Sequence, residues 1–225
     1  CGAFARNARN SRRRFGGALH PFSRLRITWQ ARRRGGLPQL AEVDLLDGAH
    51  GLMANLDGMA LAAYGCELVM ALWPEGQPIP EVFDLLQAFL PAASSLHDGE
   101  TTRLLLELRL LDMAGLLPHI GHCAECWAGL GAGDYRFDTR RGGILCPVCA
   151  GGHQGGVVVD SRTLGSLVRL LRVDPLVFDG IRLGSLTIDQ GGRLLQHCVE
   201  ETVGRPLKSE RFLASLKRPQ TGVLP

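Results

Sequence analysis

The start of the chain alternates apolar and polar residues with the two-residue period of a β-strand. Leu25, Ile27 and Trp29 face one side, and polar or charged residues lie between them. A second extended stretch follows at residues 37–43, after the turn Arg-Arg-Arg-Gly-Gly at residues 32–36. The pattern predicts two strands joined by a basic hairpin. Two strands alone make a poor core, so we expect this piece to need further strands.

From about residue 48 the apolar residues recur at helical spacing instead. We expect Asp98 or Thr101 to cap the third of the predicted helices, Gly115 to end it, and Ser161 to cap the fourth. The predicted helices cover residues 48–73, 80–90, 98–114, 161–173, 186–203 and 208–216.

Four cysteines stand in two tight pairs between the third and fourth helices. The pairs are Cys123-Ala-Glu-Cys126 and Cys146-Pro-Val-Cys149, with nineteen residues between them. Each Cys-x-x-Cys turn can present two thiolates to one ion, and two turns complete a tetrahedron. Zn²⁺ is the metal that such soft four-coordinate sites usually hold. No ligand position is left over, so the sequence predicts one structural Zn²⁺ in a short β-ribbon at about residues 119–156.

Other uses of the cysteines stay open at this point. The odd count of seven cysteines and the paired spacing favour zinc over disulfides. His119, His122 or His153 could replace a thiolate, and the second pair could perform thiol exchange. We prefer the interpretation that the metal staples a lobe too small for its own core. The alternative is a ribbon that contacts nucleic acid through Arg136, Arg140 and Arg141.

The net charge of +3 hides a strong asymmetry along the chain. The first 41 residues hold ten arginines and no acidic residue, whereas the rest hold 15 basic and 22 acidic side chains. Self-repulsion on that scale indicates a polyanion partner rather than a merely solvated basic surface. Phe4, Phe15, Phe22 and Trp29 are interleaved, and aromatic faces stack on unpaired bases. The candidate DNA-binding residues are Arg6, Arg9, Arg12, Arg13, Arg14, Arg24, Arg26, Arg32, Arg33 and Arg34.

Catalysis and membrane insertion are both disfavoured by what the sequence lacks. There is no Gly-rich phosphate loop, no Gly-x-Ser-x-Gly and no His-Glu-x-x-His. The composition, 45% hydrophobic and 21% charged, is that of an ordinary globular protein, and the apolar runs are too short to span a bilayer. We therefore expect a cytoplasmic binding protein rather than an enzyme.

The order of segments is itself distinctive: a basic strand-like start, helices, an inserted Cys-x-x-Cys ribbon, and helices again. The segments that carry this order are Ala5–Arg9 with Ser11–Arg12, Leu19–Phe22, Tyr64 with Glu67–Leu68, Glu107–Leu111 with Gly115–Pro118, Cys123–Cys126, Gly142–Cys146, and Gly204–Ser209 with Phe212–Leu213. In their order and sequence these segments resemble the bacterial RecO family of DNA repair and recombination mediators. The family's N-terminal OB-fold normally begins some tens of residues earlier than this chain does.

The resemblance implies an α+β fold: a partial N-terminal OB-fold β-barrel at residues 1–47, then a helical domain at residues 48–225 that carries the inserted four-cysteine zinc ribbon. It implies binding of single- and double-stranded DNA and annealing of complementary strands. It also implies contact with single-strand-binding protein and, with RecR, loading of RecA, and it leaves open whether RecF is required as well. Two hypotheses from other classes remain: a zinc-ribbon adaptor that binds only protein, and a thiol oxidoreductase that uses Cys146 and Cys149.

Overall fold

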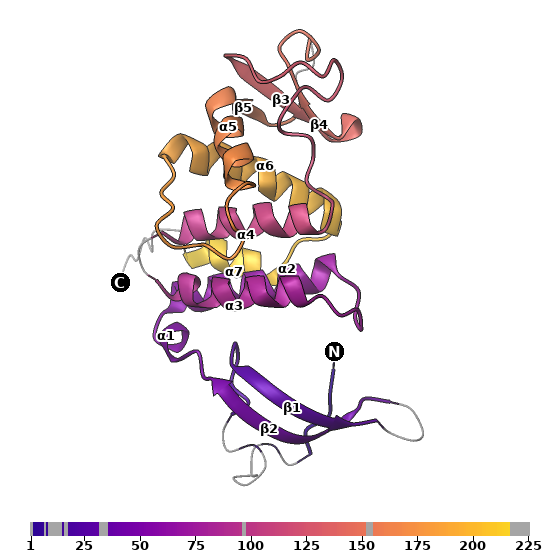
Figure 1. The fold of residues 1–225 in the computed structure, drawn as a ribbon, viewed down its shortest axis with the longest axis vertical. Helices are drawn as coiled ribbons and strands as arrows, with labels where there is room; N and C mark the ends of the chain where they lie inside the picture. The colour runs from indigo at the N-terminus through magenta and orange to yellow at the C-terminus, as the bar shows by residue number, and fades with distance from the viewer. Residues whose placement is uncertain are drawn as a thin grey trace, which may run out of the picture. The chain divides into compact units, whose positions relative to one another are not determined.

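The computed structural model describes residues 2–6, 8, 15, 18–31, 36–95, 98–151 and 155–216. The chain divides into two compact units, residues 1–56 and 57–225, and each is described by itself (Figure 1). The fold class is α+β, as expected: a small sheet in the first unit, and helices with a four-cysteine lobe in the second. The expected domain boundary at residue 47 stays a prediction.

The first unit contains the predicted pair of strands. β1 (Arg24–Gln30) pairs antiparallel with β2 (Gln39–Asp47), and Phe4 forms an isolated parallel bridge to Gln39. β2 runs four residues beyond its predicted end at Val43. Within the described residues this sheet has two strands, so the OB-fold barrel remains an expectation.

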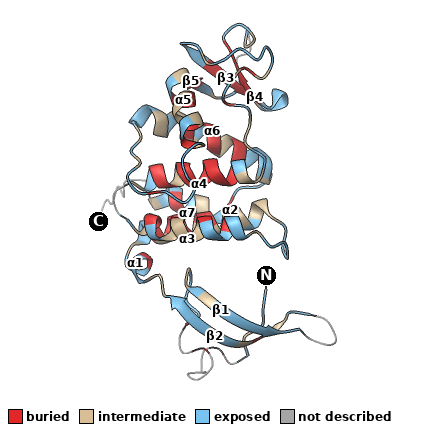
Figure 2. Cartoon of the chain, viewed as in Figure 1, coloured by how far each residue is buried: buried red, intermediate tan, exposed pale blue. Residues whose placement is uncertain are grey.

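Most residues of the first sheet are exposed rather than buried (Figure 2). Phe15, Ala18 and Leu40 are buried, whereas Ile27 is 48% exposed and Trp29 54% exposed. The alternation read from the sequence therefore gives the correct strand, but much of its apolar face lies open among the described residues.

The helices that follow the first sheet start close to their predicted positions. The stretch predicted from residue 48 to 73 is divided into α1 (His50–Met53) and α2 (Leu56–Leu72), and Asn55, a residue type favoured at N-caps, directly precedes α2. α3 (Pro80–Ser94) continues past its expected end, through Pro91. That proline lies in the last turn, where one lost backbone hydrogen bond disturbs little of the helix.

The centre of the second unit is α4 (Gly99–Met113). Asp98, rather than Thr101, is its cap, because the Asp98 carboxylate accepts a hydrogen bond from the Thr101 N–H at 3.0 Å. Ten of its fifteen residues are buried, so the helix is enclosed on all sides and not along a single stripe. Gly115 ends it with a φ of 68°, as predicted for a C-terminal glycine.

The predicted ribbon is a three-stranded antiparallel sheet. β3 (Asp134–Asp138) lies between β4 (Gly143–Leu145) and β5 (Val158–Asp160), and η2 (Thr139–Arg141) forms the turn between β3 and β4. β5 was not predicted, and the ribbon therefore extends four residues beyond its expected end.

Three helices complete the second unit: α5 (Ser161–Leu170), α6 (Ser185–Val203) and α7 (Lys208–Leu216). The prediction that Ser161 caps α5 was wrong, because the Asp160 carboxylate accepts the Arg162 N–H at 2.7 Å. α4 and α5 both pack on α6. None of the helices in the described part of the chain is long and apolar enough to cross a membrane.

Candidate metal centre and nucleic-acid interface

The four predicted cysteines converge on one point at the base of the ribbon. The sulfur atoms of Cys123, Cys126, Cys146 and Cys149 all lie within 4.8 Å of one another, and the Cys126 and Cys146 sulfurs are 3.8 Å apart. In a tetrahedral zinc site with Zn–S bonds of about 2.3 Å, neighbouring sulfurs stand about 3.8 Å apart. The cluster could thus hold one metal ion, and its donor set suits zinc.

Backbone N–H groups orient the thiols of both Cys-x-x-Cys turns, which we call the first knuckle (residues 123–126) and the second knuckle (residues 146–149). The Cys146 N–H donates to the Cys123 sulfur at 3.4 Å, and the Cys149 N–H donates to the Cys146 sulfur at 3.5 Å. Such donors stabilise thiolate sulfur, so each turn is arranged for an ionised ligand before any metal binds.

The pKa values of two of the four thiols, those of Cys123 and Cys149, are shifted from the ordinary value. Burial raises the pKa of Cys123, but hydrogen bonds from backbone N–H groups outweigh it and lower that pKa to about 6. The hydrogen bonds of Cys149 to Cys126 and Cys146 raise its pKa to about 12. Ionised sulfurs this close together repel one another, so four thiolates need a positive ion among them.

Two glycines allow the ribbon to approach the first knuckle. Gly142 has a φ of 68° and closes η2, a conformation that costs glycine little. A Cβ at Gly143 would lie 2.7 Å from the His119 carbonyl oxygen and 3.0 Å from the Ala124 Cβ. Only glycine at position 143 lets β4 run this close to the Cys-x-x-Cys turn.

The lobe is fixed to α6 by polar and aromatic contacts. The Asp160 N–H donates to the Gln190 side-chain oxygen at 2.8 Å, and the Phe137 ring meets the His197 ring edge-on at 5.8 Å. Val159 and Ile144 are fully buried. The four-cysteine cluster therefore belongs to a lobe with a small buried core of its own.

The histidines proposed as substitute ligands have other contacts. His122 stacks on Trp127, and His119 lies beside both rings. The four-thiol cluster does not include them, and His153 lies outside the described residues.

The structure describes three of the ten arginines predicted to bind DNA: Arg6, Arg24 and Arg26, all exposed. Arg24 lies opposite Asp47, and Arg26 lies opposite Asp44. The other seven lie outside the described residues: Arg9, Arg12, Arg13, Arg14, Arg32, Arg33 and Arg34.

These cross-strand pairs reduce the positive charge that the sequence count assigned to the N-terminal segment. The acidic residues lie just beyond residue 41, in β2, and the hairpin brings them onto the face of β1 that carries the arginines. Opposite charges across strands contribute about 0.2–1 kcal/mol each. Arg24 and Arg26 therefore present less net positive charge to a partner than the sequence count indicates.

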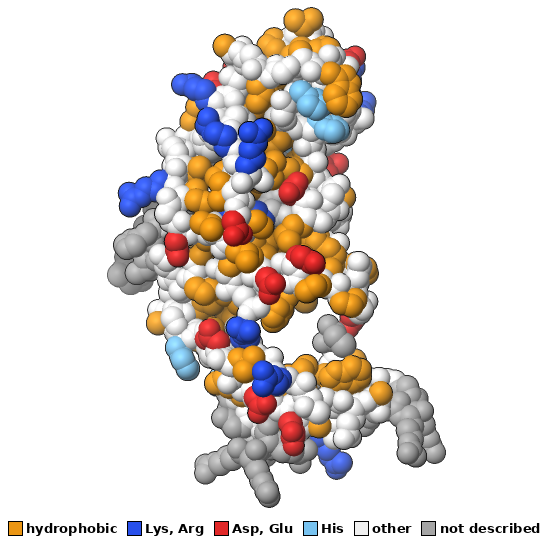
Figure 3. Space-filling model, in the orientation of Figure 1, with side chains coloured by type: hydrophobic (Ala, Val, Ile, Leu, Met, Phe, Trp, Pro, Cys, Tyr) orange, Lys and Arg blue, Asp and Glu red, His pale blue; other side chains and the backbone are white. Residues whose placement is uncertain are grey.

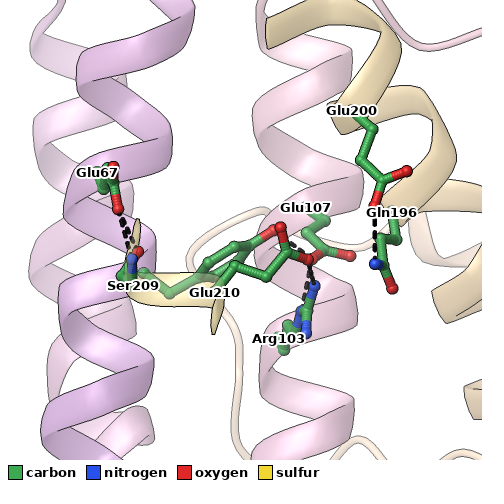
Figure 4. Close-up of polar contacts among 8 residues, drawn as sticks. Glu67, Arg103, Glu107, Gln196, Glu200, Ser209 and Glu210 are labelled. Carbon is green, nitrogen blue, oxygen red and sulfur yellow. Dashed lines mark hydrogen bonds and ion pairs between the residues drawn. The ribbon is translucent and has the colours of Figure 1, made fainter. Parts of the chain in front are cut away.

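A buried polar network in the helical unit was not predicted (Figure 4). The Tyr64 hydroxyl donates to the Glu107 carboxylate at 2.5 Å, and the Arg103 Nε donates to the same oxygen at 2.7 Å. The Arg103 Nη2 reaches Glu210 on α7 at 2.9 Å, and its guanidinium lies 4.6 Å from the Tyr64 ring centroid. Burial raises the pKa of Glu107 despite Arg103 and these hydrogen bonds.

A second carboxylate fixes the start of α7. Glu67 accepts hydrogen bonds from the backbone N–H groups of Lys208 and Ser209, at 3.1 and 2.8 Å, and from the Ser209 hydroxyl at 2.5 Å (Figure 4). Partial burial raises the pKa of Glu67, but the bonds from Ser209 and Lys208 outweigh it and leave the pKa below its usual value. A carboxylate on α2 thus caps a helix 141 residues further along the chain.

Three of the segments that carried the family resemblance meet in the Tyr64–Glu107 contact and in the Glu67 cap of α7. Tyr64, Glu107 and Ser209 come from three separate stretches, and no local pattern links them. The available signal was a charged residue, Glu107, within a run of leucines, since a buried carboxylate requires partners.

The chain matches two family models along most of its length. Residues 1–49 match the model described as "Recombination protein O N terminal", and residues 53–211 match "Recombination protein O C terminal". A protein named DNA repair protein RecO from Syntrophotalea carbinolica is 43% identical over 212 residues, which cover 94% of this chain and 82% of the relative. Relatives of the same name are 37% identical in Anaeromyxobacter dehalogenans, over 94% of this chain and 83% of the relative, and 34% identical in Myxococcus xanthus, over 95% and 85%.

Proposed function

The chain belongs to the RecO family of DNA repair proteins, and we propose that it binds single- and double-stranded DNA and anneals complementary strands. Members of this family are recombination mediators and not enzymes. The observation that carries the proposal is the match of both family models in order, over residues 1–49 and 53–211. The place of action is the cytoplasm, at the nucleoid, where the DNA is.

Family membership also supports a set of protein partners. In this proposal the protein engages single-strand-binding protein on coated DNA and, with RecR, helps to load RecA; RecF is a further candidate partner. The basic N-terminal segment and the acidic remainder of the chain separate a DNA-binding region from regions that suit protein contacts.

The ten N-terminal arginines are the proposed phosphate contacts. Because each neutralised phosphate releases counterions, the logarithm of the binding constant falls with the logarithm of salt concentration by about 0.7–0.9 per contact. Arg24 and Arg26 face carboxylates across the sheet, so we assign these two the smaller share of the phosphate contacts.

The test is the salt dependence of DNA binding by arginine variants. Changing Arg12, Arg13 and Arg14 together to alanine should lower the slope by about 2–3 and slow annealing. Changing Arg24 and Arg26 should lower it by less than about 2. The matched control is Arg193→Ala, an exposed arginine already paired with Asp189 at 2.6 Å in α6, whose loss should leave the slope unchanged.

The same binding measurements also test the hypothesis of a zinc-ribbon adaptor that binds only protein. A wild-type protein that shows no DNA shift at low salt, yet retains a protein partner, would be the zinc-ribbon adaptor. An unchanged slope in the Arg12, Arg13 and Arg14 variant removes that cluster from the interface.

We propose Zn²⁺ as the ion of the four-cysteine cluster, with a structural role only. Four thiolates at tetrahedral spacing leave no position for a substrate or water. Metal analysis of protein purified without chelator should find about one zinc per chain, with thiols that react slowly. Metal-free protein with a rapidly reacting Cys146 or Cys149 would instead support the oxidoreductase hypothesis.

A further inference from the structure

The first knuckle carries an exposed aromatic group that the metal cluster does not use. The ring of Trp127, the residue after Cys126, stacks on His122 with 4.6 Å between centroids and 23° between planes, and His119 lies 6.0 Å away. Figure 3 shows histidine side chains beside an exposed hydrophobic group on the lobe. We name Trp127, His122 and His119 the knuckle stack.

The indole is presented to solvent rather than packed into the lobe. Trp127 is 68% exposed, more than any other exposed aromatic residue among those the structure describes. His122 covers one side of the Trp127 ring. The high exposed fraction of Trp127 means that the rest of the indole surface remains open to a ligand.

The backbone beneath this ring is strained. Trp127 has a φ of 61°, in the left-handed region that glycine adopts freely and a bulky residue rarely does. The knuckle requires this turn, since the Trp127 N–H donates to the Cys123 carbonyl oxygen at 3.0 Å. Glycine would satisfy the turn without strain, so the tryptophan is a cost to the fold that a role for its ring would explain.

Two arginines lie in η2, the turn whose following residue is hydrogen-bonded to the His119 backbone. Arg140 and Arg141 form η2, and the carbonyl of Gly142, the next residue, accepts the His119 N–H at 3.0 Å. The Arg141 guanidinium pairs with Glu125, two residues before Trp127. Arg140 uses its backbone N–H in the turn, bonding to Asp138 at 2.9 Å, and its side chain is exposed.

We propose that the knuckle stack is a binding site for unpaired DNA bases, with Arg140 and Arg141 on the adjoining phosphates. This inference rests on the proposed DNA-binding function and adds a second contact region to the N-terminal arginines. An open aromatic face with neighbouring guanidinium groups is the combination that binds single strands without sequence preference. Duplex DNA keeps its bases stacked inside, so the site favours single strands.

The decisive variant is Trp127→Gly, which removes the ring and relieves the backbone strain. Its affinity for an oligothymidine should fall about 5- to 100-fold, the effect of losing one base–aromatic stack, while duplex affinity stays unchanged. Trp127→Phe should retain most of the single-strand affinity. Phe83→Ala, which removes another exposed aromatic ring from α3, is the matched control and should change nothing. Zinc content, measured in parallel, should equal that of wild type.

A fluorescence measurement reports the same contact without a loss of fold. In a Trp29→Phe, Trp73→Phe protein, Trp127 is the one remaining indole, and saturating oligothymidine should quench it, whereas duplex should not. Arg140→Ala with Arg141→Ala should lower the salt slope for single strands by about 1–1.5.

The outcomes separate this inference from the function on which it rests. Wild-type DNA binding with no loss in Trp127→Gly and no quenching overturns the knuckle site, while the N-terminal proposal stands. Absence of wild-type DNA binding overturns both. Loss of zinc or of single- and double-strand binding together in Trp127→Gly overturns the stacking role in favour of a purely structural one.

Discussion

The β1–β2 sheet and the β3–β4–β5 sheet are both small and antiparallel, yet they differ in how they obtain a core. In the first, Ile27 and Trp29 are about half exposed; in the second, Ile144 and Val159 are fully buried. Both sheets place apolar residues on alternate positions. The difference is that the second sheet has a four-thiol cluster at its base and α5 and α6 to pack on. A short sheet acquires its core from what it contacts, not from its own alternation.

Removal of the metal should break this contrast most severely. Structural zinc supplies on the order of 10 kcal/mol to small metal-bound folds. In a Cys123→Ser, Cys126→Ser protein, the amides of β3 and β4 should lose hydrogen-exchange protection, whereas those of α4 and β1 should keep theirs. Retained protection of β3 would mean that packing on α6 alone holds the lobe.

A matched pair of isoleucine truncations sharpens the comparison. Ile144→Ala removes a fully buried side chain and should cost about 2–4 kcal/mol of unfolding free energy. Ile27→Ala, the same change at a half-exposed position, should cost under about 1 kcal/mol. Chemical denaturation of both variants measures the two values, and equal values would show that the first sheet is covered in solution.

The smallest expected effect comes from an ionisable side chain. Glu107 in the second unit is buried, whereas the charged residues of β1 and β2 in the first unit are exposed. Because burial raises the pKa of Glu107 in the folded protein, folding is favoured when that carboxyl is protonated. This stabilisation is fully present below the ordinary glutamate pKa of about 4.3 and is lost as pH rises through the folded pKa.

The Glu107→Gln variant isolates that contribution. The stability of wild type relative to Glu107→Gln should increase as pH is lowered from neutral towards about 4.3, as measured by denaturation at each pH. Asp44→Asn, on the exposed face of β2, is the control and should change stability by less than about 1 kcal/mol at each pH. A difference for Glu107 that shrinks on acidification would contradict the assignment.

The features that follow from local sequence were predicted well. The Cys-x-x-Cys turns, the cap at Asp98 and the ends of α6 and α7 depend on neighbours within a few residues. β5 was missed because it is three residues long and its partner strand lies more than twenty residues earlier.

The remaining omissions depend on long-range contacts or on an atypical residue. Tyr64 and Glu107 are 43 residues apart, and only the packing of α2 on α4 brings them together. The left-handed turn at Trp127 carried no signal because glycine is the usual indicator of that conformation. The cross-strand acids opposite Arg24 and Arg26 became visible only with the strand register.

Two contacts of α7 can form only after that helix has been synthesised. They are its cap by Glu67 and the bond from Arg103 to Glu210. The cysteine ligands end at Cys149, but the last partner of the buried network is not made until α7 leaves the ribosome. At translation rates of about 5–20 residues per second, that interval is roughly 3 to 13 s. The four-cysteine lobe can therefore form first, and the network of Tyr64 and Glu107 is completed only when α7 has been synthesised.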